Sequence, residues 1–176
     1  MKMGMRQYIL ALLVFGMVQV TVGTELTAWV NGVHKNVNFE CPPGETIVYV
    51  YGMIISSEDD RMWRINCAPK VTIGTCSWSG FSSTGANSNH QCSGNGALAG
   101  IRSYYDTASR DRRFAYRCCS VSSSSTVCSI TNYLNSLDRH LEYGVPAINY
   151  VNGMATAFDS GTKDRRWQMY ECRYRY

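Results

Sequence analysis

Eight cysteines are the residues of this sequence best suited to covalent chemistry. They are Cys41, Cys67, Cys76, Cys92, Cys118, Cys119, Cys128 and Cys172. An even number of cysteines in an exported chain predicts disulfides. A zinc site is the alternative, but the sequence has no Cys-x-x-Cys pair, and His34, His90 and His140 lie far from any cysteine cluster. We therefore expect every cysteine to be oxidised, and we expect no metal site and no other cofactor.

Export is predicted by the first residues of the chain. Lys2 and Arg6 precede an apolar run at 8–20, and small residues follow it, which predicts a signal peptide at 1–23 with cleavage after Gly23. The run has 13 residues, whereas a membrane span needs roughly 20. We expect one secreted domain at 24–176 and no membrane span. With Lys2 and Arg6 removed, 15 basic and 13 acidic side chains remain, a balance too near neutral to indicate nucleic acid binding.

A second pattern with chemical potential is an Asp-Arg-x-aromatic motif that occurs three times, each time followed by a cysteine. The copies are Asp60-Arg61-x-Trp63, Asp111-Arg112-x-Phe114 and Asp164-Arg165-x-Trp167, spaced 51 and 53 residues apart. Repetition of this kind indicates an internal repeat, with copies at about 36–76, 87–127 and 128–176.

The repeated Asp-Arg pair has two interpretations. It could form a charged ligand site, or it could form a bidentate bond between carboxylate and guanidinium that ties one unit to the next. Repetition favours the structural interpretation, because a catalytic site rarely occurs in three copies and buried charges persist only when paired. We also expect each motif Arg to stack on the aromatic ring two residues further on.

The elements that would position these residues are predicted to be strands. In the first unit, 47–55 is rich in β-branched and aromatic residues, a polar connection follows, and 61–67 returns. The runs 97–105 and 153–158 match the first strand in the later units, whereas 80–93 and 120–126 are polar and predict loops. These patterns predict an all-β fold of three degenerate strand-loop-strand hairpins around one core. That fold would be pseudo-threefold and disulfide-stapled, with at most one short helix, at 132–143.

Strand alternation makes predictions about individual side chains. Trp63 and Arg61 share one face of their strand, so the aromatic should face the core with Arg61 along its edge. Cys118 and Cys119 point to opposite faces and should have different partners. Cys41 with Cys67 would close the first repeat, and by symmetry Cys92 should close the second.

Several ordered motifs across residues 29–173 resemble the dermatopontin family. They are Trp29-Val30-Asn31, Phe39-x-Cys41-Pro42-x-Gly44, Cys92-Ser93-x-Asn95-Gly96-x-x-Ala99-Gly100, the pair Cys118-Cys119, and Asp164-Arg165-x-Trp167-x-x-x-x-Cys172-Arg173. Phe114 departs from the pattern, because the family usually has Trp there. The resemblance implies the pairings Cys41–Cys67, Cys76–Cys118, Cys92–Cys119 and Cys128–Cys172.

The resemblance also implies a function. Family members are extracellular matrix proteins that bind proteoglycans and sulfated glycans, promote cell adhesion and affect collagen fibril assembly. Invertebrate relatives resemble agglutinating lectins. We therefore expect a secreted, non-enzymatic matrix protein whose partners are glycosaminoglycans, or matrix proteins such as collagen or fibronectin-like proteins. It could also form a homo-oligomer.

Basic and aromatic side chains off the core face are the candidate ligand contacts. They are Arg113, Arg117, Arg166, Arg173, Arg175, Tyr104, Tyr105, Tyr174 and Tyr176. Arginine suits sulfate and carboxylate because its donors form a planar fork. The alternatives are a lectin-like agglutinin, a cytolysin and a secreted hydrolase, but no HExxH, GxSxG or Cys–His signature of a hydrolase occurs.

Overall fold

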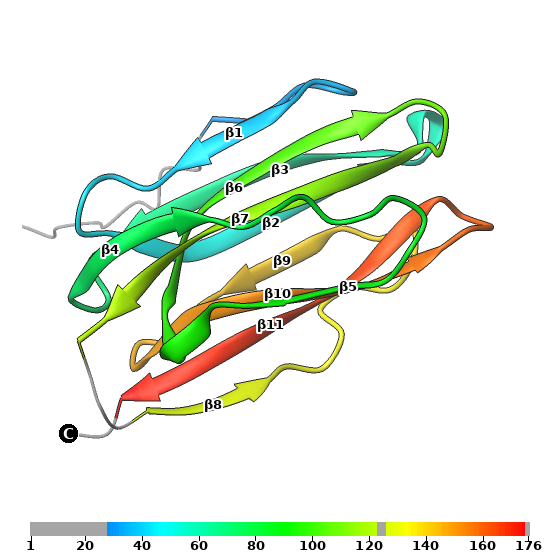
Figure 1. Cartoon of the computed structure of the whole chain (residues 1–176). Coiled ribbons are helices and arrows are strands. Elements are labelled where there is room, and N and C mark those ends of the chain that lie inside the picture. The colour runs from blue at the N-terminus through cyan, green and yellow to red at the C-terminus, as the bar shows by residue number, and fades with distance from the viewer. Residues whose placement is uncertain (1–27, 123–125, 175–176) are drawn as a thin grey trace, which may run out of the picture.

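The computed structural model describes residues 28–122 and 126–174 (Figure 1). This part of the chain has eleven strands, two short 3-10 turns at Ser56–Glu58 and Ser93–Asn95, and no α-helix. The strands are β1 Val37–Glu40, β2 Thr46–Ile55, β3 Asp60–Ala68, β4 Ile73–Trp78, β5 Ser88–Gln91, β6 Ala97–Asp106, β7 Asp111–Val121, β8 Thr126–Ile130, β9 Leu141–Gly144, β10 Asn149–Asp159 and β11 Asp164–Tyr174. The predicted all-β fold is confirmed, whereas the predicted signal peptide lies outside the described residues.

Three long antiparallel hairpins, β2–β3, β6–β7 and β10–β11, form the frame of the molecule. Each hairpin turns immediately before a motif aspartate. The residue before that aspartate has a left-handed backbone in all three turns, with φ of 49° at Asp59, 51° at Arg110 and 55° at Lys163. The repeated sequence motif therefore marks the same place in each hairpin, the first residues of the returning strand.

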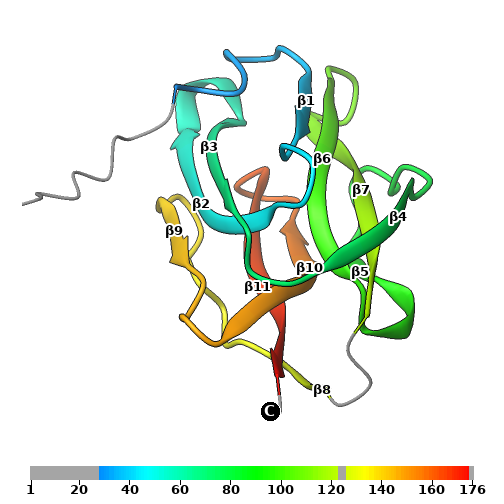
Figure 2. The same ribbon diagram turned by 90° about the vertical axis from the view of Figure 1, so that its left-hand side faces the viewer.

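Short strands connect the hairpins into a closed circle. β1 pairs with β6, β5 pairs with β10, and β9 pairs with β2, so the strand that precedes each hairpin joins the next hairpin. β4 and β8 extend the sheets along β7 and β11. We name the units by these strands: the first holds β1–β3, the second β4–β7 and the third β8–β11. Viewed from the side in Figure 2, the three units surround a common interior.

Two of the three strand exchanges between units bring backbones close together at a glycine. Gly100 faces Glu40, and Gly153 faces Gln91. A Cβ at Gly153 would lie 2.1 Å from the carbonyl oxygen of His90, so no larger residue fits there without moving the strand. In the exchange that closes the circle, Gly144 on the incoming strand faces Tyr49. A Cβ at Gly144 would meet only the ring of Tyr49 at 4.0 Å, so this crossing does not require glycine.

The predicted helix at 132–143 is wrong. Within this segment the backbone N–H of Leu134 donates to the carbonyl of Trp167 on β11, and Leu141 is fully buried at the start of β9. The leucine spacing resembles a helix face, but pairing with neighbouring strands uses the backbone that a helix would need. Strand β5 also lies inside the polar segment 80–93 that was predicted to be a loop.

Two of the disulfides implied by the family resemblance are present, Cys41–Cys67 and Cys128–Cys172, and two are not. The structure has Cys76–Cys119 and Cys92–Cys118 in place of Cys76–Cys118 and Cys92–Cys119. The reason is strand register, because Cys76 on β4 faces Cys119 on β7. Cys92–Cys118 also repeats Cys41–Cys67, with a sequence separation of 26 in both bonds. As strand alternation predicts, Cys118 and Cys119 have different partners.

Candidate functional site

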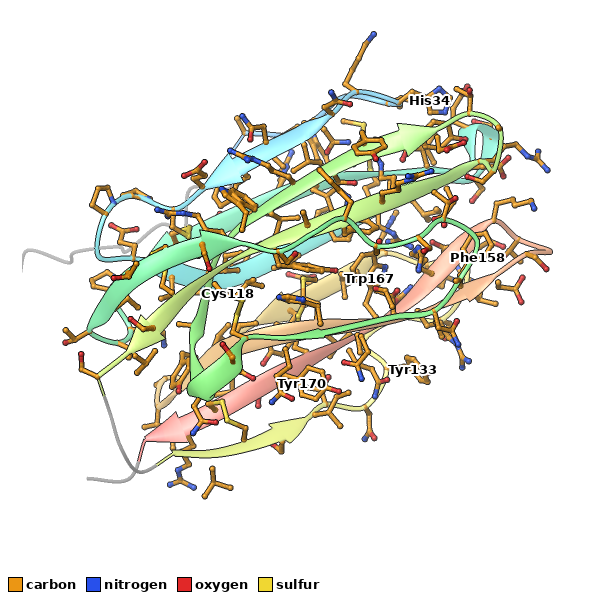
Figure 3. All side chains as sticks on the ribbon, viewed as in Figure 1. His34, Cys118, Tyr133, Phe158, Trp167 and Tyr170 are labelled. Carbon is orange, nitrogen blue, oxygen red and sulfur yellow. A yellow bond between two sulfur atoms is a disulfide. The ribbon has the colours of Figure 1, made fainter. Side chains whose placement is uncertain are left out.

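The aromatic residue of each motif lies at the centre of the molecule, as predicted. Trp63, Phe114 and Trp167 pack with their rings nearly perpendicular, and the ring centroids are 4.9 Å apart for Trp63–Trp167, 5.1 Å for Phe114–Trp167 and 6.3 Å for Trp63–Phe114. Edge-to-face packing is the favoured arrangement of such rings. Figure 3 shows Trp167 between the sheets. The phenyl ring of Phe114 takes the place of a third indole.

The Asp-Arg pairs form a circle of ion pairs that runs from unit to unit. Arg112 of the second unit binds Asp60 of the first through Nε and Nη2, at 2.5 and 2.8 Å. Arg165 of the third unit binds Asp111 of the second in the same way, at 2.9 and 2.5 Å. The circle closes where Nη2 of Arg61 lies 2.8 and 3.0 Å from the two carboxylate oxygens of Asp164.

Each motif carboxylate also accepts a hydrogen bond from the backbone of a loop residue. The backbone N–H groups of His34, Gly85 and Asp138 donate to Asp60, Asp111 and Asp164, each across 26 residues of sequence. All three donors have a left-handed backbone, with φ of 57°, 68° and 56°. The residue after each donor extends the pattern, since the carbonyls of Lys35, Ala86 and Arg139 accept from the guanidinium groups. These loop residues were not identified from the sequence, although their constant spacing to the motif aspartates was available.

We expected each motif arginine to stack on the aromatic residue two positions further on, but Arg112 and Arg165 lie over other rings. Arg112 lies 5.8 Å from the ring centroid of Tyr105, and Arg165 lies 5.0 Å from that of Phe158. Tyr105 and Phe158 are the residues that face these arginines across their own hairpins. The guanidinium group therefore crosses to the neighbouring strand, which is the direction in which it reaches the next carboxylate.

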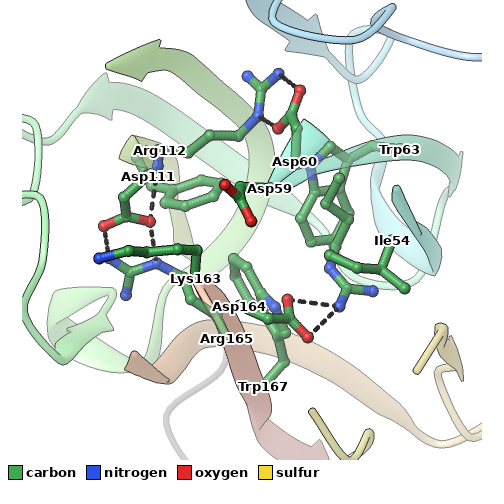
Figure 4. Close-up of a pocket in the computed structure, with 12 residues that line it drawn as sticks. Ile54, Asp59, Asp60, Trp63, Asp111, Arg112, Lys163, Asp164, Arg165 and Trp167 are labelled. Carbon is green, nitrogen blue, oxygen red and sulfur yellow. Dashed lines mark hydrogen bonds and ion pairs between the residues drawn. The ribbon is translucent and has the colours of Figure 1, made fainter. Parts of the chain in front are cut away.

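A depression at the turn end of the hairpins is lined by the three ion pairs and the three aromatic residues, together with Ile54, Asp59 and Lys163 (Figure 4). The motif side chains in it are closed to solvent, with at most 5% of any motif Asp or Arg side chain exposed. Its remaining space suits about two or three water molecules. Every carboxylate in the circle is bound to an arginine, so the arrangement joins the units and leaves little reactive surface.

Three of the predicted surface contacts, Arg113, Tyr104 and Arg166, lie in two groups on the outer faces of the hairpins. On the second unit, the guanidinium of Arg113 lies 5.7 Å from the ring centroid of Tyr104 and 3.5 Å from the Asp106 carboxylate. Phe81 packs edge to face on Tyr104 at 4.8 Å. On the third unit, the guanidinium of Arg166 lies over the ring of Tyr133 at 4.2 Å. Phe81 and Tyr133 are the members that the sequence did not identify.

The other candidates are dispersed. Arg117 is a partner of Glu40 at 3.5 Å, and Arg173 is exposed on β11 beside β8. Tyr105 stacks on His34 at 4.1 Å, which leaves its ring less open to a ligand, and burial raises its pKa. Arg175 and Tyr176 lie outside the described residues, as does the side chain of Tyr174.

One histidine lies closer to cysteine than the sequence suggested. Nε2 of His90 is 3.3 Å from Sγ of Cys118, and His90, Cys92 and Cys118 bring three potential metal ligand atoms together. Cys92 and Cys118 are bonded to each other, so neither offers the thiolate that binds zinc. The imidazole of His90 stacks on the ring of Tyr116 at 4.8 Å, and burial lowers the pKa of His90.

The described residues contain no helix that is long and apolar enough to cross a membrane. No solved structure gives a significant match to the chain.

The family comparison covers most of the sequence. A family model described as Dermatopontin matches residues 31–176. The chain is 32% identical to a dermatopontin of Biomphalaria glabrata, over 83% of this chain and 100% of that protein. It is 30% identical to a hemagglutinin/amebocyte aggregation factor of Limulus polyphemus, over 83% and 87% of the two chains, and 30% identical to dermatopontin of Homo sapiens, over 82% and 76%. With this coverage and with the repeated motifs in place, the chain belongs to the dermatopontin family.

Proposed function

We propose that this chain is a secreted, non-enzymatic matrix protein that binds sulfated or carboxylated glycans of proteoglycans through arginines on its outer surface. Family membership and the horseshoe crab agglutinin relative support the coarser assignment, an extracellular matrix or agglutinin-type protein. Matrix proteins such as collagen are further partners under this proposal. Cleavage after Gly23 would release the mature chain.

One observation carries the glycan part of the proposal: on the outer faces of the second and third hairpins, an arginine lies in the same cluster as an exposed aromatic ring, Phe81 or Tyr133. Arg166 is exposed beside Tyr133, and 39% of the Arg113 side chain is exposed beside Tyr104. The N–H groups of a guanidinium form a planar fork that fits sulfate or carboxylate. An exposed ring next to it provides an apolar surface for the C–H face of a sugar.

The buried acidic groups support a binding role over catalysis. Asp60, Asp111 and Asp164 each lie in an ion pair and accept a backbone hydrogen bond, so none is poised as a general acid or base. All eight cysteines are in disulfides, so none provides a thiol nucleophile.

Affinity for heparin and dermatan sulfate tests the proposal. A variant with Arg113, Arg117, Arg166 and Arg173 all changed to Gln should raise the Kd for heparin at least roughly tenfold, and the difference should shrink as salt screens the charges. A matched control changes Lys35, Lys70, Arg110 and Arg139 to Gln, which removes the same charge away from these four arginines. If the two variants lost equal affinity for heparin, the attraction would depend only on overall charge and the assigned surface would be wrong.

A further inference from the structure

We propose that the second and third units each carry one acidic-saccharide site, so that a single chain binds two glycans and bridges them. The inference rests on the proposed glycan-binding function and specifies how many sites there are and where. The first site is formed by Phe81, Tyr104, Asp106 and Arg113. The second is formed by Tyr133, Asp159 and Arg166.

The aromatic residues of the two sites occupy the same structural position. Phe81 comes immediately before Ser82, whose backbone N–H donates to the carbonyl of Phe114 at 2.8 Å. Tyr133 comes immediately before Leu134, whose N–H donates to the carbonyl of Trp167 at 2.8 Å. Both rings project outward, with exposed fractions of 48% and 44%. Figure 3 shows Tyr133 away from the interior that holds Trp167.

The arginines are equivalent in the same way. Arg113 and Arg166 directly follow the buried motif arginines and directly precede the buried aromatics of β7 and β11. Because neighbouring residues on a strand face opposite sides, both guanidinium groups lie outside the core. In the second unit Tyr104 lies between Arg113 and Phe81, whereas in the third unit its place is taken by Ala157 and Arg166 reaches Tyr133 directly.

An aspartate at the start of each hairpin turn completes each site. Asp106 accepts hydrogen bonds from the backbone of Ala108 and Ser109, and Asp159 accepts them from Gly161 and Thr162. The backbone N–H of Ser109 lowers the pKa of Asp106, and that of Thr162 lowers the pKa of Asp159, with contributions from Arg113 and Arg166. Each carboxylate is thus fixed by its turn and attracts the nearby arginine, which limits the positions that the arginine can adopt.

The first unit lacks this combination, which sets the number of sites at two. The equivalent positions hold Trp29, Ile55 and Met62, so an aromatic residue is present without the acid or the arginine. Arg64 does lie over Trp29 at 4.2 Å, but it comes from two residues further along β3. The two complete sites stand on different sheets, since β6 and β7 belong to one sheet and β10 and β11 to another. A short saccharide at one site therefore leaves the other free for a second glycan.

The ligand class follows from the chemistry of the side chains. The ring offers a surface for the apolar face of a pyranose, and the guanidinium edge offers paired donors for a sulfate or carboxylate on that sugar. Two sites on one chain allow cross-linking of glycan-bearing surfaces without a second protein copy.

Calorimetric titration with a heparin-derived tetrasaccharide tests the number of sites. We expect two tetrasaccharides per parent chain, one per chain for Arg113→Gln or Arg166→Gln, and no saturable binding for the double variant. The matched control is Arg102→Gln, which removes an arginine stacked on Trp78 at 4.0 Å outside both sites and should keep two. Light scattering on the same samples gives the number of chains per particle, so that the number of bound tetrasaccharides can be expressed per chain.

Bridging provides the second measurement, with heparin-coated beads as the probe. The parent and the control should aggregate the beads, whereas each single variant should bind a bead without joining it to another. A parent that binds one tetrasaccharide per chain, or single variants that retain two, would overturn the two-site inference while leaving glycan binding intact. A parent that binds no tetrasaccharide and no heparin bead would refute the proposed function itself.

Discussion

The two kinds of bond that close this molecule differ in how completely they follow the threefold repeat. The ion pairs at the turn end occur in all three units and each joins one unit to the next. The disulfides lie within units, and each type occurs in only two. Cys41–Cys67 and Cys92–Cys118 are one type, whereas Cys76–Cys119 and Cys128–Cys172 are the other.

The positions that lack a disulfide are easily identified from the equivalent residues. Val145 of the third unit corresponds to Cys41 and Cys92, because its backbone N–H donates to the carbonyl of Val48 as theirs donate to Ala99 and Asn152. Each of these carbonyls belongs to a residue at a β-bulge. A bond within a unit can be absent from one copy, since strand pairing still holds that unit. A circle between units has no such tolerance, because loss of one link leaves a buried charge and opens the ring.

The largest expected effect comes from breaking the circle of ion pairs. Arg112→Ala leaves the buried carboxylate of Asp60 without its guanidinium and should lower the free energy of unfolding by about 3–5 kcal/mol. Urea unfolding followed by tryptophan fluorescence measures it. Changing both partners, with Asp60→Leu and Arg112→Met, should recover much of the loss, since no unpaired charge remains.

The control for this experiment is an exposed ion pair. Arg102 contacts Glu40 at 3.2 Å with about 40% of each side chain exposed, so Arg102→Ala should cost less than about 1 kcal/mol. If Arg112→Ala proved no more costly than Arg102→Ala, the contrast between the essential circle and dispensable surface pairs would be wrong.

A smaller effect is expected from completing the disulfide pattern in the third unit. Val145→Cys with Glu171→Cys places cysteines at the equivalents of Cys41 and Cys67 and should raise the free energy of unfolding by about 1–3 kcal/mol. This gain in stability should be smaller than the value expected from the lower entropy of the cross-linked unfolded chain. The reason is that Glu171 accepts a hydrogen bond from Asn149, which the substitution removes. Val145→Ser with Glu171→Ser is the matched control. Two persistent free thiols, or stability no higher than that of the serine variant, would show that the third unit does not share this geometry.

Much of this architecture could be predicted from residue spacing. Three copies of Asp-Arg-x-aromatic predict three hairpins, and strand alternation predicts an inward Trp63 and divergent partners for Cys118 and Cys119. These properties depend on residues that are close together in the sequence, so they can be predicted from a single sequence. The spacing also predicts a bond between units, and the structure has it.

The remainder depends on contacts between residues far apart in the sequence. Nothing local shows that β9 returns to β2, and the leucines of 132–143 suggest a helix because only their spacing is visible. The partners that the family resemblance implies for Cys76 and Cys92 are wrong for a similar reason. A shift of one residue in the register of β4 on β7 exchanges Cys118 for Cys119 as the partner of Cys76. Phe81 and Tyr133 lie in loops whose equivalence becomes visible only through their backbone hydrogen bonds to the central strands.

The smallest expected effect is a pH dependence at the disulfide end of the second unit. His90 lies against Tyr116 and the Cys92–Cys118 bond, and burial lowers its pKa below the usual value of 6.5. The unfolded chain therefore binds a proton at His90 more readily than the folded chain does. The contribution to stability is complete above pH 6.5 and is lost as the pH falls below that value. His90→Phe keeps a ring against Tyr116 and should flatten the dependence of the free energy of unfolding on pH between about 7.5 and 5. If the free energy of unfolding depended on pH equally in the variant and the parent, other groups would determine that dependence. The site beside the disulfide would then hold a protonated imidazole as readily as water does.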